Sequence, residues 1–388
     1  MTTVTSFAKD FSRICGLLLV ASAGLVSCSE NDTPLPVESD SKNIDYSAAN
    51  AAGWHNYSVR VGQLLANDSK NLYNAWESSY NGGEAFKNTF KNHASPYTSP
   101  IGCIEEILDG CAEIANEVGE AKIGDPYDLY KSNKLEEALY AVESWYSWHS
   151  RDDYSNNILS VRNSYFGSLT TEIADASMSA LVESLDPGLD ARMKAAVDAA
   201  YNAILAIPQP FRNNIGSMEA VAAMNACTEL DHLINNELKP FFHGLGSSYD
   251  ATLSDIVANY VDNVVLPTYK SLMERNDALL NAVKELAAAP SDRAFSNACD
   301  AWLSSREPWE KSEAFLFGPV DAMGLDPNMD SWPLDQDAIV NHLKSGNFDD
   351  LDWGEGDDDQ KVEAAQNIRG FHTLEFLLFK DGKPRKVN

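Results

Sequence analysis

Basic residues are scarce in this chain. Its 388 residues include 29 Lys and Arg against 58 Asp and Glu, a formal net charge of -29. Proteins bind the phosphates of nucleic acids with clustered Lys and Arg, so this balance excludes nucleic acid as a partner. An acidic surface favours solubility and attracts cations, and the charge alone does not separate these two roles.

Cysteines are also few, and no C-x-x-C spacing occurs among the six, which argues against a cysteine zinc site. Beyond the N-terminal segment there are four: Cys103, Cys111, Cys227 and Cys299. In one continuous helix, Cys103 and Cys111 would lie about two turns apart, too far for a disulfide. We predict that these four cysteines are small buried residues, and we leave open whether any two of them form a disulfide.

The apolar run 14–26 is too short for a membrane span, which needs about 20 residues. Lys9 and Arg13 precede it, so we interpret residues 1–27 as a signal peptide. The run ends in Leu25-Val26-Ser27-Cys28, which resembles the lipobox of bacterial lipoproteins. The resemblance implies that Cys28 carries lipid and anchors the protein to a membrane of the cell envelope.

The polar residues that follow, 28–44, are predicted to form a flexible tether after the lipidated cysteine. Ser29, rather than Asp, stands after Cys28, which favours the outer membrane by analogy with lipoprotein sorting.

Period-two alternation of apolar and polar residues is absent, which argues against β-sheets. Apolar residues recur instead at helical spacing, for example from Leu189 to Ile204, with Pro208 as a stop. We predict an all-α protein of two helical bundles, 45–246 and 247–388, divided at the Gly- and Ser-rich stretch 244–248. Residues 318–360 are expected to be irregular, and 362–379 to form the last strong helix.

One polar pair stands out in that last helix. His372 and Glu375 are three residues apart, so they share a helical face, and Gly370 lies close by. Their neighbours are strongly apolar, which indicates a partly buried polar pocket whose groups need partners or a ligand. The pair can ligate one cation or form a hydrogen bond; the alternative is an ordinary surface face of a helix.

Gly370-x-His372-x-x-Glu375, followed by Phe-Leu-Leu-Phe, resembles the GxHxxE helix of imelysin-like proteins. The segments around Arg306-Glu307-x-Trp309 and Asp330-Ser-Trp332-Pro333 are similar to the family's upstream motifs, in the right order. This similarity covers Asp255 to about Arg385.

In most of that family a second helical half follows the GxHxxE helix, whereas here it ends close to the end of the sequence. An earlier segment of this chain resembles that second half: Glu143-Ser144-x-x-Ser147 with Ser150 and Asn157. The halves therefore stand in swapped order, as in circularly permuted members. The resemblance implies two similar four-helix bundles with a site between them.

This resemblance also implies the site residues. The metal- or ligand-binding set is His372, Glu375, Glu143, Ser147, Ser150 and Asn157. The set that supports them is Gly370, Arg306, Glu313 and Ser144, with a structural ion pair as the alternative for Arg306 and Glu313.

Zinc-peptidase motifs are missing: the chain has no H-E-x-x-H, and no second His stands four residues from His372. We therefore favour a non-enzymatic lipoprotein that binds iron or another divalent metal, or a chelate, for uptake with iron-uptake components. The alternatives are a metallopeptidase, which the family name implies, and a surface interaction module without metal. The acidic run 349–359 lacks EF-hand spacing and is predicted to be a solvated loop.

Overall fold

The computed structural model describes residues 44–353 and 357–387. The predicted signal peptide, Cys28 and nearly all of the predicted tether lie outside these residues. Among the helices described, none is both long and apolar enough to cross a membrane.

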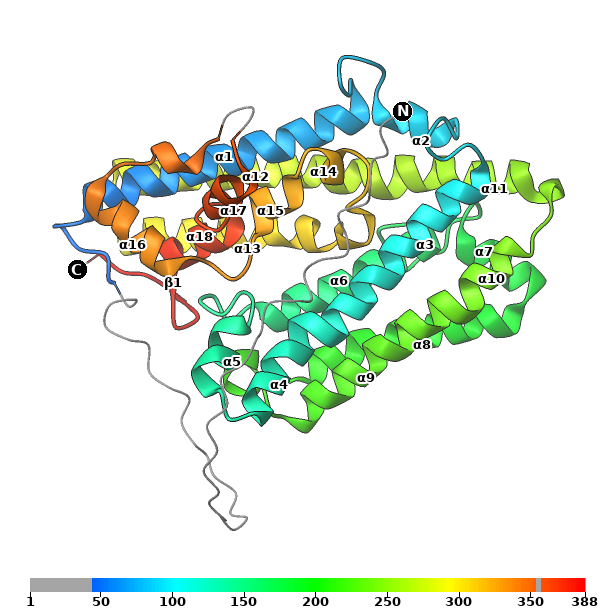
Figure 1. The fold of residues 1–388 in the computed structure, drawn as a ribbon, viewed down its shortest axis with the longest axis horizontal. Coiled ribbons are helices and arrows are strands. Elements are labelled where there is room, and N and C mark those ends of the chain that lie inside the picture. The colour runs from blue at the N-terminus through cyan, green and yellow to red at the C-terminus, as the bar shows by residue number, and fades with distance from the viewer. Residues whose placement is uncertain (1–43, 354–356, 388) are drawn as a thin grey trace, which may run out of the picture. The chain divides into compact units, whose positions relative to one another are not determined.

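The chain is all-α, as predicted, and eight of its helices form two rings of four (Figure 1). In the first bundle each helix packs against two others of the set α3 (Pro100–Glu117), α6 (Ser150–Phe166), α8 (Pro187–Ala206) and α9 (Met218–Leu233). The second bundle consists in the same way of α1 (Ala51–Glu77), α12 (Leu266–Ala288), α13 (Asp292–Glu310) and α18 (Gly370–Leu378). The bundles meet where α13 packs against α6.

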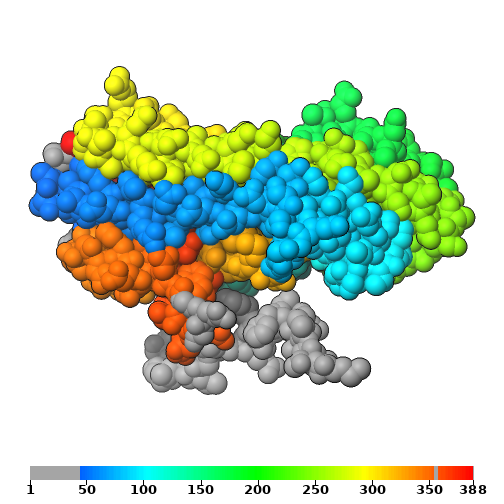
Figure 2. All heavy atoms as spheres, turned by 90° about the horizontal axis from the view of Figure 1, so that it is seen from above, coloured from blue at the N-terminus to red at the C-terminus, as the bar shows by residue number. Residues whose placement is uncertain are grey.

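The grouping of the helices differs from the predicted division at residue 246. Helix α1 belongs by sequence to 45–246, yet it packs against α12 and α18. Figure 2 shows this pairing from above, with α1 in blue beside the yellow stretch after residue 265. Conversely, α11 (Asp250–Tyr260) packs on α3, because the helix runs on from α11 through the π-helical η5 (Val261–Val265) into α12. Pro267 follows η5 within this continuous helix, and it lacks the N–H that a residue in the interior of a helix donates.

Shorter elements complete the first bundle and its connections. They are α2 (Phe86–Lys91), η1 (Val118–Gly124), α4 (Asp125–Lys131), α5 (Leu135–Ala141), α7 (Met178–Leu185), η2 (Phe211–Asn213), η3 (Ile234–Leu238), α10 (Lys239–His243) and η4 (Ser247–Tyr249). The π-helical η1 directly continues α3 and packs against α9 and α6 of the same bundle.

The stretch expected to be irregular contains several short helices. They are α14 (Pro319–Ala322), α15 (Leu325–Asp330), α16 (Gln336–Ser345) and η7 (Asp349–Leu351), preceded by η6 (Glu313–Phe315) and followed by α17 (Asp359–Gln366). A short antiparallel hairpin of two strands, β1 (Phe379–Lys380) and β2 (Lys383–Pro384), follows α18.

The predicted single helix over 362–379 is wrong, because α17 ends at Gln366 and α18 begins anew at Gly370. Gly370 has φ +81°, a left-handed conformation that disfavours other residues, and a Cβ there would lie 2.3 Å from the carbonyl oxygen of Met329. The glycine thus admits a close approach of the α15 backbone to the start of α18.

All nine residues of α18 are buried, which explains its largely apolar sequence. Tryptophans from two neighbouring helices hold its backbone: Trp54 Nε1 donates to Leu377 O and Trp302 Nε1 to Phe371 O, both at 2.9 Å. Burial of each large apolar side chain contributes about 1.5–3 kcal/mol, so α18 is fixed by packing on several sides. The four cysteines predicted to be buried are buried and free.

Candidate functional site

His372 is fully buried, and carboxylates face both of its ring nitrogens. Nε2 lies 3.1 Å from Asp330 Oδ1 and 3.2 Å from Glu143 Oε1. Nδ1 lies 3.0 Å from Glu375 Oε2. Ionised carboxylates only accept hydrogen bonds, so an imidazole bonded on both sides must donate from both nitrogens and carry a positive charge.

Electrostatics agrees with this geometry. Burial lowers the pKa of His372, but Asp330, Glu143 and Glu375 outweigh it and raise the pKa well above the ordinary 6.5. Near neutral pH the imidazole is therefore a cation that partly balances the surrounding acids. A metal ligated by Nε2 has to replace the proton on that nitrogen.

Glu375 holds the imidazole from the opposite side. Its Oε1 accepts hydrogen bonds from the backbone N of Ser147 at 2.8 Å and from Ser147 Oγ at 2.7 Å. With Oε2 on His372 Nδ1, both carboxylate oxygens are engaged. This arrangement matches a carboxylate that orients a metal-binding histidine, rather than one that ligates the metal itself.

Asp330 is brought to His372 by the contact at Gly370. It ends α15, directly after Met329, whose carbonyl packs against the glycine. Trp309 Nε1 donates to Asp330 Oδ2 at 2.6 Å, which fixes the carboxylate. The Trp332 ring lies edge-on to the imidazole, with 4.9 Å between ring centres.

Glu143 reaches the site from the first bundle, in the turn between α5 and α6. Ser150 Oγ donates to its backbone carbonyl at 2.6 Å, and Lys122 Nζ, on η1, lies 3.1 Å from its Oε2. Burial raises the pKa of Glu143, but Lys122 and then His372 lower it to about 2. The carboxylate is therefore ionised at any physiological pH and available as a ligand.

Arg306, on α13, lies fully buried at the centre of the acidic cluster. Its guanidinium makes close ion pairs with Glu310 and Asp330, and lies 3.3 Å from Asp153 and 3.5 Å from Glu143. One guanidinium thus compensates four carboxylates from both bundles, and it is the main positive charge that holds them together.

The structure brings several predicted site residues together. The Glu143–Asn157 segment contacts the His372 helix through Glu143 and Ser147, as a site shared between the two segments requires. Ser144 Oγ donates to Asp153 Oδ2 at 2.5 Å, and Asn157 Nδ2 to Glu310 Oε2 at 2.5 Å, so both support acids beside Arg306. The Ser150 hydroxyl bonds backbone instead of facing the imidazole.

Other residues that contact His372 or its partners were missing from the sequence prediction. Asp330 stands in the Asp-Ser-Trp-Pro signature, where a polar residue in a motif was a usable signal. Glu310 is four residues after Arg306 on the same face of α13, a spacing that indicates an ion pair. The spacing around Lys122 and Asp153 gives no such signal, because only the tertiary structure brings them here.

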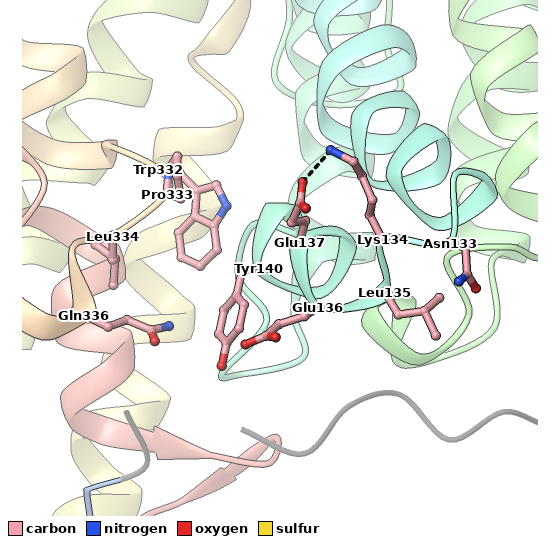
Figure 3. A pocket seen from close by; sticks show the side chains of 10 residues that line it. All are labelled: Asn133, Lys134, Leu135, Glu136, Glu137, Tyr140, Trp332, Pro333, Leu334 and Gln336. Atoms are coloured by element: carbon pink, nitrogen blue, oxygen red, sulfur yellow. Dashed lines mark hydrogen bonds and ion pairs between the residues drawn. The ribbon is translucent and has the colours of Figure 1, made fainter. Parts of the chain in front are cut away.

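A cavity of about 660 Å³ adjoins this centre (Figure 3). Trp332 and Gln336 line it from one side and Tyr140 and Glu136, on α5, from the other. Since the Trp332 ring also lies against His372, this indole separates the cavity from the buried imidazole.

Three ligand atoms in the described chain converge beside the imidazole. One atom each of Glu143, Asp330 and His372 lies within 4.8 Å of the other two, a spacing that can hold a metal ion. A ring nitrogen with two carboxylate oxygens is a donor set used by zinc and by iron, copper and nickel sites. The residues present therefore fit a divalent metal.

The fold and this centre define an all-helical protein with a buried histidine–carboxylate cluster between two bundles. The family model Imelysin matches residues 35–236 and 265–387, and the chain belongs to the imelysin family.

Two relatives are informative. A crystal structure of an imelysin peptidase from Bacteroides ovatus is 61% identical, with TM-score 0.89, and the match covers 90% of this chain and 100% of that one. Iron-regulated protein A of Synechococcus elongatus is 31% identical over 144 residues, 37% of this chain. That match spans 36% of the relative's own length.

Proposed function

We propose that the protein is a cell-envelope lipoprotein that binds iron or another divalent metal, as part of metal uptake. The observation that carries the proposal is the convergence of Glu143, Asp330 and His372 within 4.8 Å. In this proposal His372 Nε2 and one oxygen from each acid ligate the ion. The name of the iron-regulated relative supports iron as the cargo and iron-uptake components as partners.

Glu375 has a supporting role in this proposal. It accepts the Nδ1 proton of His372 and so presents Nε2 to the metal, while Ser147 fixes Glu375 in turn. This explains why the H-x-x-E spacing matters even though the two side chains do not share one ion.

Metal binding by this centre should release protons. At pH 7 we expect about one proton per metal ion, because the His372 imidazolium must be neutral to ligate. Calorimetric titration of the purified protein with Zn²⁺ or anaerobic Fe²⁺, in buffers of different ionisation enthalpy, counts these protons. Absence of metal binding would leave the surface interaction module as the function.

A metallopeptidase is less well supported, although the Bacteroides ovatus relative is described as a peptidase. His372 and Glu375 are completely buried, and a polypeptide substrate must reach the metal for cleavage. The metal-loaded protein should therefore leave an unfolded polypeptide intact; chelator-sensitive cleavage would reverse this conclusion.

The envelope location rests on Cys28. Replacing it, Cys28→Ser, should move the protein from the membrane fraction to the soluble fraction and abolish fatty-acid labelling, because the thiol is the proposed acylation site. Cys15→Ser, within the proposed signal peptide, is the matched control and should change neither readout. Unchanged membrane partition of the Cys28→Ser protein would disprove the anchor.

A further inference from the structure

Glu313 is a buried acid without a partner of its own. Only 8% of it is exposed, and in the described part of the chain its carboxylate makes no hydrogen bond and no ion pair. An ionised carboxylate removed from water needs a counter-charge, so its position requires an explanation.

The neighbours of Glu313 supply more negative charge. Oxygens of Glu310, Glu313 and Asp330 lie within 4.8 Å of one another, the second such convergence in the described residues. Arg306 already pairs with Glu310 and Asp330, and Lys122 lies 3.1 Å from Glu143, so neither cation pairs with Glu313. Three carboxylate oxygens thus lie close enough together to contact one shared cation.

The charge balance of the centre points the same way. Six acidic side chains are at least nine-tenths buried there: Glu143, Asp153, Glu310, Glu313, Asp330 and Glu375. If all six were ionised, the two permanent cations Lys122 and Arg306 would leave four negative charges. Burial raises the pKa of Glu310 and of Glu313 in the metal-free protein, whereas two divalent ions, with His372 neutral, would balance all six acids in their ionised form.

Exposed acids lie near Glu313. Burial raises the pKa of Glu313 well above its usual value; Lys122 opposes the rise, and Glu310, Asp326 and Glu117 add to it. Asp326, on α15, and Glu117, on α3, are both exposed, so the acidic group around Glu313 includes acids at the surface.

We infer that Glu310, Glu313 and Asp330 form a second divalent-cation site, with Asp330 shared with the metal at His372. An all-oxygen donor set suits a hard ion such as Mn²⁺, Mg²⁺ or Ca²⁺. The sharing of Asp330 rests on the proposed function, whereas the convergence at Glu313 does not.

Equilibrium dialysis of the purified protein with Mn²⁺ at pH 7.5 tests the inference. Wild type should bind two ions, and Glu313→Gln and His372→Gln one each. Glu219→Gln, an exposed acid on α9, is the matched control and should keep two. Electron paramagnetic resonance should show spin coupling in the doubly loaded wild type and none in either site variant.

Stability provides an independent readout. Without metal, Glu313→Gln should melt at or above the wild-type temperature, because it removes an unpaired buried charge, and added Mn²⁺ should raise its melting temperature less than that of wild type. Failure of the Glu313→Gln protein to fold without metal would contradict the inference. Glu313→Asp shortens the ligand side chain, so it should bind the second ion at least about tenfold more weakly.

The outcomes separate the two proposals. Two ions retained by Glu313→Gln would overturn the second site. One ion in wild type, lost only in His372→Gln, would overturn it while supporting the proposed function. One ion lost only in Glu313→Gln would keep the Glu313 site and remove the His372 site. No binding would overturn both.

Discussion

Replacing His372 with glutamine should weaken binding of the first metal ion by at least about 100-fold at pH 7.5. The reason is that Nε2 is the nitrogen ligand of the set, and changes to residues that merely orient a ligand already cost 10–100-fold. Competition with a chromophoric chelator measures the loss. Glu375→Gln should cost about 10–100-fold, because the imidazole stays but its orienting acceptor is lost.

The pH dependence should change in the same variants. Because the pKa of His372 is raised, the wild-type affinity should fall with decreasing pH over a window that begins above 6.5, the ordinary histidine value. His372→Gln should show a shallower slope. An equal affinity and an equal slope in wild type and variant would exclude His372 as a ligand.

The metal-free protein should show the opposite trend in stability. A group whose pKa is raised on folding stabilises the fold fully below its unfolded pKa and loses that contribution as the pH rises through the folded value. For His372 the loss lies above pH 6.5, so metal-free protein becomes less stable there while metal binding becomes stronger.

Replacing Arg306 with methionine should destabilise the protein by about 3–5 kcal/mol, which is the cost of breaking a buried ion-pair network from one side. Four carboxylates lose their common cation. Two of them belong to the first bundle: Asp153 on α6 and Glu143 in the turn before α6. Urea unfolding monitored by circular dichroism measures the change.

Arg192→Met is the matched control, since Arg192 pairs with Glu237 at the surface, where such pairs contribute up to about 1 kcal/mol. The cost at Arg306 should also shrink on acidification, as the unpaired acids take up protons. If the two variants unfold at the same urea concentration, the buried cluster does not depend on Arg306.

The sequence predicted the helical class because apolar spacing survives in any packing, and it predicted His372 and Glu375 because an i, i+3 pair is local. It missed the start of a new helix at Gly370, since apolar periodicity continues through the break. It also failed to place α1, whose partners are far away in sequence.

The sequence predicted those site residues that stand in recognisable motifs. Glu143 and Ser147 came from the family resemblance, and their contacts with the His372 helix followed. Lys122 and Asp330 reach the same centre through a π-helical extension and a short helix end, neither of which has a periodic signature. The swapped order of the halves stays a prediction.

Glu143 and His372 are separated by 229 residues, and this distance has a consequence for biosynthesis. Joining such remote segments costs loop-closure entropy, and packing offsets it only when both bundles are in place. No contiguous fragment on either side of residue 246 holds all three proposed ligands. A growing or partly degraded chain that lacks either part therefore cannot assemble the His372 site, and capture at this site becomes a property of completely folded molecules alone.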